Sequence, residues 1–207
     1  MTSKEISTRI TNCIKAGVSC IYAVSHEEAR VQKQITDIAK DLRYSIWSWT
    51  TSVGMQQECC QPLDKTQDPI PALNVFMMHN VSGATGEPRG TTIANKSIVM
   101  LKDMHMFLRH PVPNLIRKLK DCIALGKATN RHLIIIGCAL ELPPELSKEI
   151  TVIEYNLPSR EELADMAKSL AKSAKVDLDG ELDHVLDAGS GLTITEFEDA
   201  CAIAKVE

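Results

Sequence analysis

An acidic residue directly after an apolar run marks one place in this sequence where chemistry is expected. Residues 97–101 form the run, and Lys102 and Asp103 end it. A carboxylate at the end of a buried strand can hold Mg²⁺ for phosphoryl transfer, and a glutamate beside it would activate the attacking water. The next residue here is Met104, so that activating group is lacking. The competing interpretation is that Asp103 caps the turn or helix that follows.

Such an acid would need a phosphate-binding loop as its partner. That loop joins the first core strand to the next helix, and it requires glycine-rich backbone, a lysine and a Ser or Thr. At this junction the sequence reads Ser25-His26-Glu27-Glu28-Ala29-Arg30, without glycine or lysine. Its two carboxylates suit a helix start but would repel a triphosphate. We therefore expect no phosphate binding at this junction.

A glycine-rich stretch occurs elsewhere, at residues 83–92. It has Gly90 where the lysine of a phosphate loop would stand, it contains Pro88, and it precedes a strand rather than a helix. Proline removes an amide donor that a phosphate would use. We interpret this stretch as a flexible loop.

Other groups of reactive side chains give weaker signals. Asp103, His105 and His110 are residue types that bind metals, but their spacing matches no compact zinc signature. Cys59 and Cys60 are adjacent, which makes them poor partners for each other in a disulfide. The serine and histidine of the junction described above lack a third triad member and a glycine-flanked nucleophile elbow. We expect neither a metal site nor covalent catalysis.

Five cations lie close together in the sequence, namely Arg109, Arg117, Lys118, Lys120 and Arg131. They could bind nucleic acid, or reach the nucleotide of a neighbouring subunit as an arginine finger does. The formal net charge of the chain is −4, opposite in sign to that of a dedicated nucleic-acid-binding domain. We interpret these residues as a solvated helical face and do not expect nucleic acid as a partner.

The overall composition is that of a folded globular protein, with 44% hydrophobic and 24% charged residues in a chain of 207. No apolar run approaches the roughly 20 residues that cross a bilayer, and residues 1–10 do not form a signal peptide. The seven cysteines are scattered and odd in number, as is typical of reduced thiols. These features predict a cytoplasmic protein without a membrane partner.

Alternating strand and helix patterns position the residues named above. Apolar runs predict strands at residues 19–24, 44–49, 97–101, 132–136 and 151–154. Helical patterns cover residues 3–17, 25–42, 69–79 and 111–126, and a short helical turn is expected at 143–148. Ser25 and Glu28 form a capping-box pattern, while residues 50–68 and 80–96 are typical of loops. Because apolar strands alternate with helices, the sequence predicts a three-layer α/β/α fold with a parallel sheet.

The composition changes after Asn156. Ser159 and Glu162 form a second capping-box pattern at a helix start, and further helices are expected at about 179–188 and from Thr193 onward. Trp47 and Trp49 lie two apart in a strand, share one face of it, and are expected in the core. The sequence therefore predicts a core at residues 1–156 and a small helical lid at residues 157–207.

The order of these elements resembles the AAA+ superfamily of nucleotide hydrolases. Residues 97–103 have the form of a Walker B strand, residues 133–140 lie where a sensor-1 strand would, and residues 157–163 look like the start of an AAA+ lid. More narrowly, the chain is similar to the N-terminal, non-catalytic half of a group of bacterial, phage and chloroplast AAA ATPases. The segments that carry this similarity are residues 21–31, 99–105 and 140–150.

The resemblance implies an AAA+-like fold without a phosphate loop, followed by a second AAA domain, so that the chain would be a piece of a longer protein. It implies that ATP and Mg²⁺ act in that whole protein, with no cofactor and no catalytic residue in this segment. Asp103 is the single candidate cofactor-binding residue. We expect a non-catalytic module for assembly, regulation or partner docking, through self-association or contact with the second domain. The alternative is an enzyme that binds and hydrolyses ATP through a non-standard phosphate loop.

Overall fold

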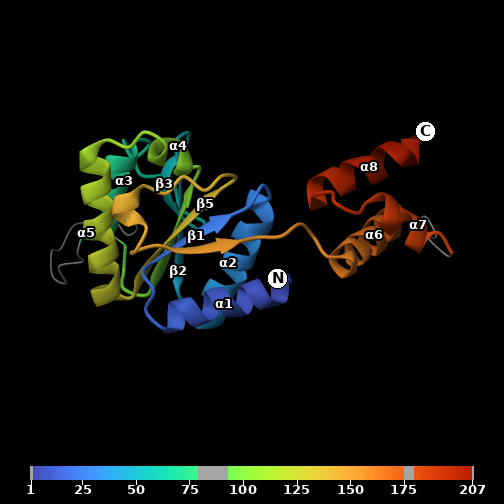
Figure 1. Cartoon of the computed structure of the whole chain (residues 1–207), viewed down its shortest axis with the longest axis horizontal. Helices are drawn as coiled ribbons and strands as arrows, with labels where there is room; N and C mark the ends of the chain where they lie inside the picture. Colours follow the sequence, from blue (N-terminus) through green and yellow to red (C-terminus); the bar gives the residue numbers. More distant parts are fainter. Residues whose placement is uncertain (1, 79–92, 175–179, 207) are drawn as a thin grey trace. The chain divides into compact units, whose positions relative to one another are not determined.

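The computed structural model describes residues 2–78, 93–174 and 180–206. Six strands form one sheet in the order β3-β2-β4-β5-β1-β6 (Figure 1). Five of them run parallel: β1 (Cys20–Val24), β2 (Ser45–Thr50), β4 (Ser97–Lys102), β5 (Arg131–Gly137) and β6 (Thr151–Glu154). The remaining strand, β3 (Gly54–Gln57), pairs antiparallel with β2 at one edge.

Helices cover both faces of this sheet (Figure 1). On one side lie α1 (Ser3–Lys15) and α2 (Glu28–Leu42). On the other side lie α3 (Pro69–Met77), α4 (His105–Leu108) and α5 (Pro113–Thr129), with the 3-10 turn η1 (Pro144–Leu146) beside α5. The three-layer α/β/α class predicted from the sequence is therefore confirmed.

Alternation along the strands builds the core, because successive side chains of a strand point to opposite faces of the sheet. One cluster joins alternate strand residues to α3 and α5; its strand members include Cys20, Tyr22, Trp47, Trp49, Val99, Leu101, Leu133 and Ile135. Trp47 is paired with Val99, and Trp49 with Leu101, across β2 and β4. The prediction that both tryptophans lie on one buried face is confirmed. Trp49 also donates from Nε1 to the carbonyl of Thr66 at 2.6 Å.

Two short elements differ from the sequence prediction. β3 lies within residues 50–68, which were expected to be a loop, and Gly54 begins it with a φ of 89°. A Cβ at Gly54 would lie 2.4 Å from Thr66 Oγ1, the atom that accepts a hydrogen bond from the Met55 amide. Close approach of this kind requires glycine, and a strand of four residues shows too little alternation to be predicted. α4 has only four residues and gave no helical pattern either.

The chain divides into two compact units, Ser7–Glu154 and Met1–Ile6 with Tyr155–Glu207. The second unit contains α6 (Arg160–Ala174), α7 (Leu182–Ala188) and α8 (Ile194–Val206). Their small core consists of Leu163, Ala167, Leu186 and Phe197. The functional division into a core at 1–156 and a lid at 157–207 stays a prediction. In the described part of the chain, no helix combines the length and the apolarity that a bilayer crossing requires.

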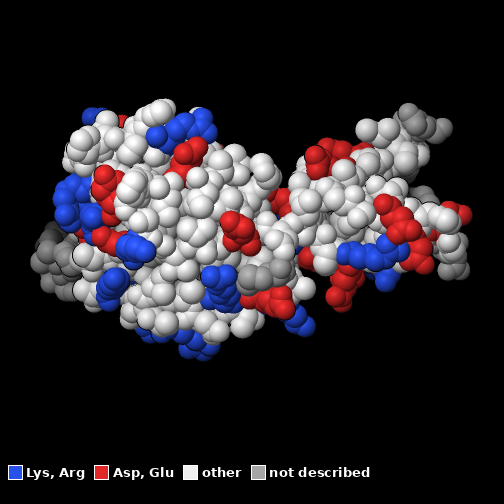
Figure 2. Space-filling view, in the orientation of Figure 1, with Lys and Arg blue, Asp and Glu red and all other residues white. Residues whose placement is uncertain are grey.

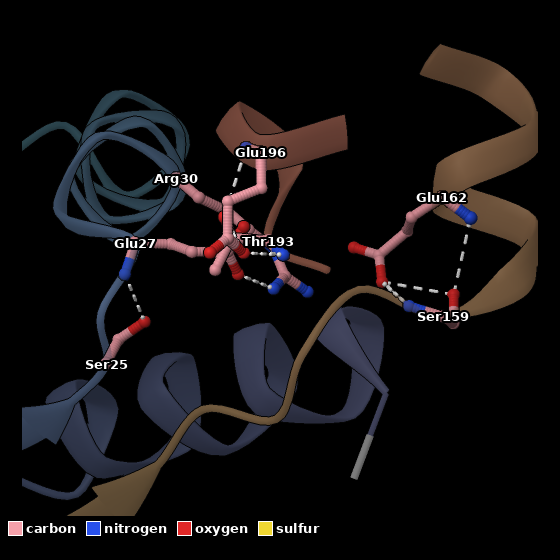
Figure 3. A network of polar contacts seen from close by, with 7 residues as sticks. All are labelled: Ser25, Glu27, Arg30, Ser159, Glu162, Thr193 and Glu196. Atoms are coloured by element: carbon pink, nitrogen blue, oxygen red, sulfur yellow. Dashed lines mark hydrogen bonds and ion pairs between the residues drawn. The ribbon is translucent and has the colours of Figure 1, made fainter. Parts of the chain in front are cut away.

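The expected capping box at the start of α6 is present (Figure 3). The backbone amide and the hydroxyl of Ser159 both donate to Glu162 Oε2, at 2.9 and 3.0 Å, and the Glu162 amide donates back to Ser159 Oγ at 3.3 Å. Thr193 and Glu196 repeat the arrangement before α8. Each box satisfies amides that a helix start leaves without intrahelical partners.

Candidate functional site at the carboxyl edge of the sheet

The carboxyl ends of β1, β4 and β5 meet at one edge of the sheet, which is where α/β folds commonly bind ligands. β5 lies between β4 and β1. The Ser25 amide, directly after β1, donates to the carbonyl of Gly137 at 2.9 Å. The Asp103 amide, directly after β4, donates to the carbonyl of Ile136 at 2.9 Å. These bonds hold the three strand ends, and the turns that follow them, side by side.

The turn between β1 and α2 is tight, and it differs in detail from the prediction. α2 begins at Glu28 and its N-cap residue is Glu27, whose side chain makes no capping bond. Ser25 Oγ accepts a hydrogen bond from the Glu27 amide at 3.0 Å (Figure 3). A serine hydroxyl that bonds the amide two residues on closes a local turn. The predicted capping box of Ser25 and Glu28 is therefore wrong, because the helix starts too late for Ser25 to cap it.

Two carboxylates occupy the start of α2. Glu27 Oε2 accepts from Arg30 Nη1 at 2.5 Å (Figure 3), and both side chains are largely buried. Glu28 Oε1 lies 2.9 Å from Lys102 Nζ, at the end of β4. The same ammonium group donates to Gln32 Oε1 at 2.6 Å. The positive end of the α2 dipole therefore already has the carboxylates of Glu27 and Glu28 beside it. Lys102, the lysine at this edge of the sheet, is paired with Glu28.

Asp103 stands at the end of β4, where the sequence placed it, with its side chain 64% exposed. Its φ of 54° turns the chain sharply out of the strand, a conformation that aspartate adopts more readily than most residues. Asp103 does not cap α4 as its N-cap residue, because that residue is Met104, which makes no side-chain capping bond. In the turn that follows β4, the Asp103 carbonyl accepts from the Met106 amide at 3.1 Å. The carboxylate instead lies 3.8 Å from His105 Nδ1, measured from Oδ1.

His105 is only 4% exposed and packs against Gly137. A Cβ at Gly137 would lie 2.6 Å from His105 Nδ1, so glycine makes room for the imidazole. His105 Nε2 lies 3.6 Å from the sulfur of Cys138. The structure thus brings Asp103 and His105 together, leaves His110 exposed, and adds a cysteine that the sequence analysis missed. Within the described ranges, no three His, Cys, Asp or Glu side chains form a group able to hold a metal ion.

The loop after Cys138 is anchored to the sheet. The hydroxyl of Tyr22 donates to the carbonyl of Ala139 at 2.7 Å and accepts from the Glu141 amide at 3.4 Å. Burial raises the pKa of Tyr22 above its usual range, so this hydroxyl stays protonated and keeps donating. The Glu141 carboxylate in turn accepts from Arg109 Nε at 3.0 Å. The backbone that follows Cys138 is therefore held in place by Tyr22, and the Glu141 side chain by Arg109.

Arg131 does not belong to the surface on which the sequence analysis placed it. It begins β5 and is 1% exposed. Its Nη1 donates to the carbonyls of Phe76 and Met78, at 2.7 and 3.0 Å, at the end of α3. Burial lowers the pKa of the guanidinium from its usual value. The interpretation of Arg131 as part of a solvated helical face is wrong, because the first residue of a central strand points into the protein.

Three other cations of this group, Arg117, Lys118 and Lys120, lie on α5, and two of them are paired with carboxylates. Arg117 Nη2 lies 2.5 Å from Asp121 Oδ1, and Lys120 Nζ lies 3.5 Å from Glu149 Oε1. Figure 2 shows basic and acidic side chains interspersed on the visible face. A mixed surface of this kind does not give the continuous positive potential that nucleic-acid binding uses. The glycine-rich stretch at 83–92 lies outside the described residues.

Residues 6–155 match the family model described as SpoVK-like AAA ATPase, N-terminal domain. Curated relatives carry the name uncharacterized AAA domain-containing protein ycf46. The one from Trieres chinensis is 28% identical over 183 residues, covering 87% of this chain and 34% of the relative. The one from Guillardia theta is 25% identical over 186 residues, covering 89% and 34%. The chain thus spans about a third of the length of these relatives.

Solved structures with the same fold include a DNA replication initiation factor, with a TM-score of 0.61. Another is the replication initiator DnaA bound to AMPPCP and single-stranded DNA, with a TM-score of 0.60. Each is 10% identical in sequence, and each match covers 98% of this chain and 60% of the other. At this identity the likeness shows the fold alone, in agreement with the three-layer arrangement around the sheet.

Proposed function

The chain belongs to the family of SpoVK-like AAA ATPase N-terminal domains, and from this premise we propose that it is a non-catalytic module of a larger AAA+ ATPase. In this role it acts in assembly, regulation or partner docking. The observation that carries the proposal is the turn between β1 and α2, where internal acids take the place of a phosphate-binding loop. The proposed fold is thus AAA+-like but lacks a working phosphate loop.

Electrostatics at the start of α2 supports this proposal. A phosphate at that helix end would have to approach the carboxylates of Glu27 and Glu28. Each carboxylate already has its own cation, Arg30 for Glu27 and Lys102 for Glu28. A phosphate that drew either cation away would expose a repulsion of about 1 kcal/mol at 4 Å in water, or about 4 kcal/mol near a protein surface. The groups that could attract a phosphate already have partners in the chain. Lys102 is paired with Glu28, and the Ser25 hydroxyl accepts from the Glu27 amide. A triphosphate would therefore lose more at this turn than it gains from the helix dipole.

Asp103 is the remaining candidate for nucleotide chemistry, as the acid at the Walker B-like strand end. We propose that it does not hold Mg-ATP in this chain. Its neighbour Met104 is fully buried and offers no carboxylate to activate water. The nearest strand-end lysine, Lys102, is paired as described. An exposed carboxylate without phosphate oxygens beside it gives Mg²⁺ too few ligands, since this cation usually combines protein acids with substrate phosphates.

A calorimetric titration with Mg-ATP tests the proposal. We expect no saturable heat in the unaltered chain at millimolar nucleotide. The rival hypothesis, an enzyme with a non-standard phosphate loop, requires saturable binding that is lost in Asp103→Ala. Asp121→Ala is the matched control, because Asp121 is also an exposed carboxylate but lies on α5, paired with Arg117. Binding that disappears in the first variant and persists in the second would refute the non-catalytic assignment.

The proposed partners are a second copy of the chain or an AAA domain of the same protein. The relatives are about three times as long as the matched region and are named for an AAA domain, which leaves room for such a partner. Sedimentation velocity at increasing concentration tests self-association, which would raise the sedimentation coefficient. We propose no nucleic-acid partner, because Arg117 and Lys120 on α5 are paired with carboxylates. Binding of single-stranded DNA at low salt would contradict that statement.

A further inference from the structure

We propose that Cys138 is a reactive thiol, activated by His105 with the Asp103 carboxylate beside the imidazole, that hydroperoxides oxidise to a sulfenic acid. The three side chains follow β4 and β5 at the same edge of the sheet. The sulfur lies 3.6 Å from His105 Nε2, which is within hydrogen-bonding distance for sulfur. Asp103 Oδ1 lies 3.8 Å from the other ring nitrogen, Nδ1. A base next to a thiol is an arrangement that activates nucleophiles, and a carboxylate near the base favours its positive charge electrostatically.

The imidazole of His105 is unusual in its surroundings. It is buried, yet within the described part of the chain its Nδ1 atom has no hydrogen-bond partner. A buried polar atom without a partner is costly. When Nε2 takes the thiol proton, both ring nitrogens become donors, with the thiolate on one side and the Asp103 carboxylate on the other. The Asp103 carboxylate thus faces the ring nitrogen opposite the one that takes the proton.

Accessibility separates Cys138 from the buried cysteines of the chain. Cys138 is exposed, whereas Cys20 and Cys122 are buried. Burial raises the pKa of Cys122 to about 12 and also raises that of Cys20, so these two remain inert thiols. Cys59 and Cys60 are exposed as well, but the described residues give neither of them an imidazole partner. Among these cysteines, Cys138 is thus both exposed to solvent and next to an imidazole that can act as a base.

The oxidation needs only the groups present and the hydroperoxide. His105 takes the thiol proton, and the thiolate sulfur attacks one peroxide oxygen. The sulfur–oxygen bond forms as the oxygen–oxygen bond breaks, and the two electrons that sulfur loses are gained by the peroxide. The imidazolium returns its proton to the leaving oxygen, which departs as water from hydrogen peroxide or as an alcohol from an organic hydroperoxide. The product is the sulfenic acid of Cys138, the first and reversible stage of thiol oxidation.

Trapping of sulfenic acid in the whole chain tests the proposal. The chain is treated with hydrogen peroxide and dimedone, and mass spectrometry follows the labelling of each cysteine. A positioned general base contributes about a hundredfold or more to a step in which it takes a proton. His105 Nε2 lies at the long end of hydrogen-bonding distance from the sulfur, 3.6 Å, so only part of this gain is expected. We therefore expect Cys138 to be labelled about ten times faster than Cys59 and Cys60, which serve as internal references.

Two variants separate activation from a merely structural role. His105→Gln should bring the rate of Cys138 down to that of Cys59 and leave the reference rates unchanged. Because His105 is buried, circular dichroism must show that this variant is folded. Asp103→Asn changes an exposed side chain and should slow Cys138 severalfold without disturbing the fold. Equal rates for Cys138, Cys59 and Cys60 in the unaltered chain would overturn the proposal, and so would full reactivity of Cys138 in both variants.

Discussion

Replacing Arg131 by methionine tests how a buried guanidinium joins α3 to the first residue of β5. The arginine donates to the carbonyls of Phe76 and Met78 at 2.7 and 3.0 Å. Methionine has a similar length but no donor, so the buried carbonyl of Phe76 and the partly buried one of Met78 lose their partner. An unsatisfied buried polar group costs about 1–3 kcal/mol, and relief of the guanidinium's own desolvation offsets part of this. We expect the free energy of unfolding to fall by about 2–3 kcal/mol.

Urea denaturation followed by tryptophan fluorescence measures this loss, because Trp47 and Trp49 lie in the same core cluster as Phe76. With an m-value of about 2 kcal/mol/M, the midpoint should fall by about 1–1.5 M. Arg117→Met is the matched control, since Arg117 is exposed and pairs with Asp121 one helical turn away; we expect no measurable shift there. Equal midpoints for the two variants would refute the reasoning about Arg131.

Two further substitutions and one change of pH should alter stability, as the described contacts predict. Gly54→Ala, at a φ of 89° and with Thr66 Oγ1 in the place of the new Cβ, should lower stability to urea by about 1–3 kcal/mol; an unchanged midpoint would contradict the strain. Ser159→Ala removes a helix cap and should cost about 1 kcal/mol, visible as faster hydrogen exchange in the first turn of α6 but not of α2. Burial lowers the pKa of His132, so the unfolded chain binds its proton more readily. Stability should therefore fall as the pH drops below about 6.5, and a denaturation series in His132→Gln should show a flatter dependence.

Much of the fold could be predicted because its strands are strongly apolar. The run at 151–154 coincides with β6, and the capping box of Ser159 and Glu162 marks the start of α6, since both signals are local. The capping-box pattern of Ser25 and Glu28 gave a wrong prediction. The Ser25 hydroxyl bonds the amide of Glu27, and a four-residue motif cannot tell this local turn from a helix cap.

The candidate site was predictable only where it depends on neighbours in the sequence. The acidic turn after β1 and the position of Asp103 were visible, because each follows an apolar run directly. Cys138 was not, since its partner His105 lies 33 residues away and only the pairing of β4 with β5 brings the two together. The burial of Arg131 likewise depends on the position of α3. A charge in the sequence gives its sign, but only the fold decides whether it faces water.

The proposed role requires that the turn between β1 and α2 does not hold a triphosphate. Amide spectra of the isotope-labelled chain, recorded by NMR with and without millimolar Mg-ATP, test it most directly. We predict that the amide signals of Glu27, Glu28 and Ala29 stay in place as nucleotide is added. Saturable shifts centred on these three amides would mean that phosphates bind there despite the two carboxylates, and would contradict the account.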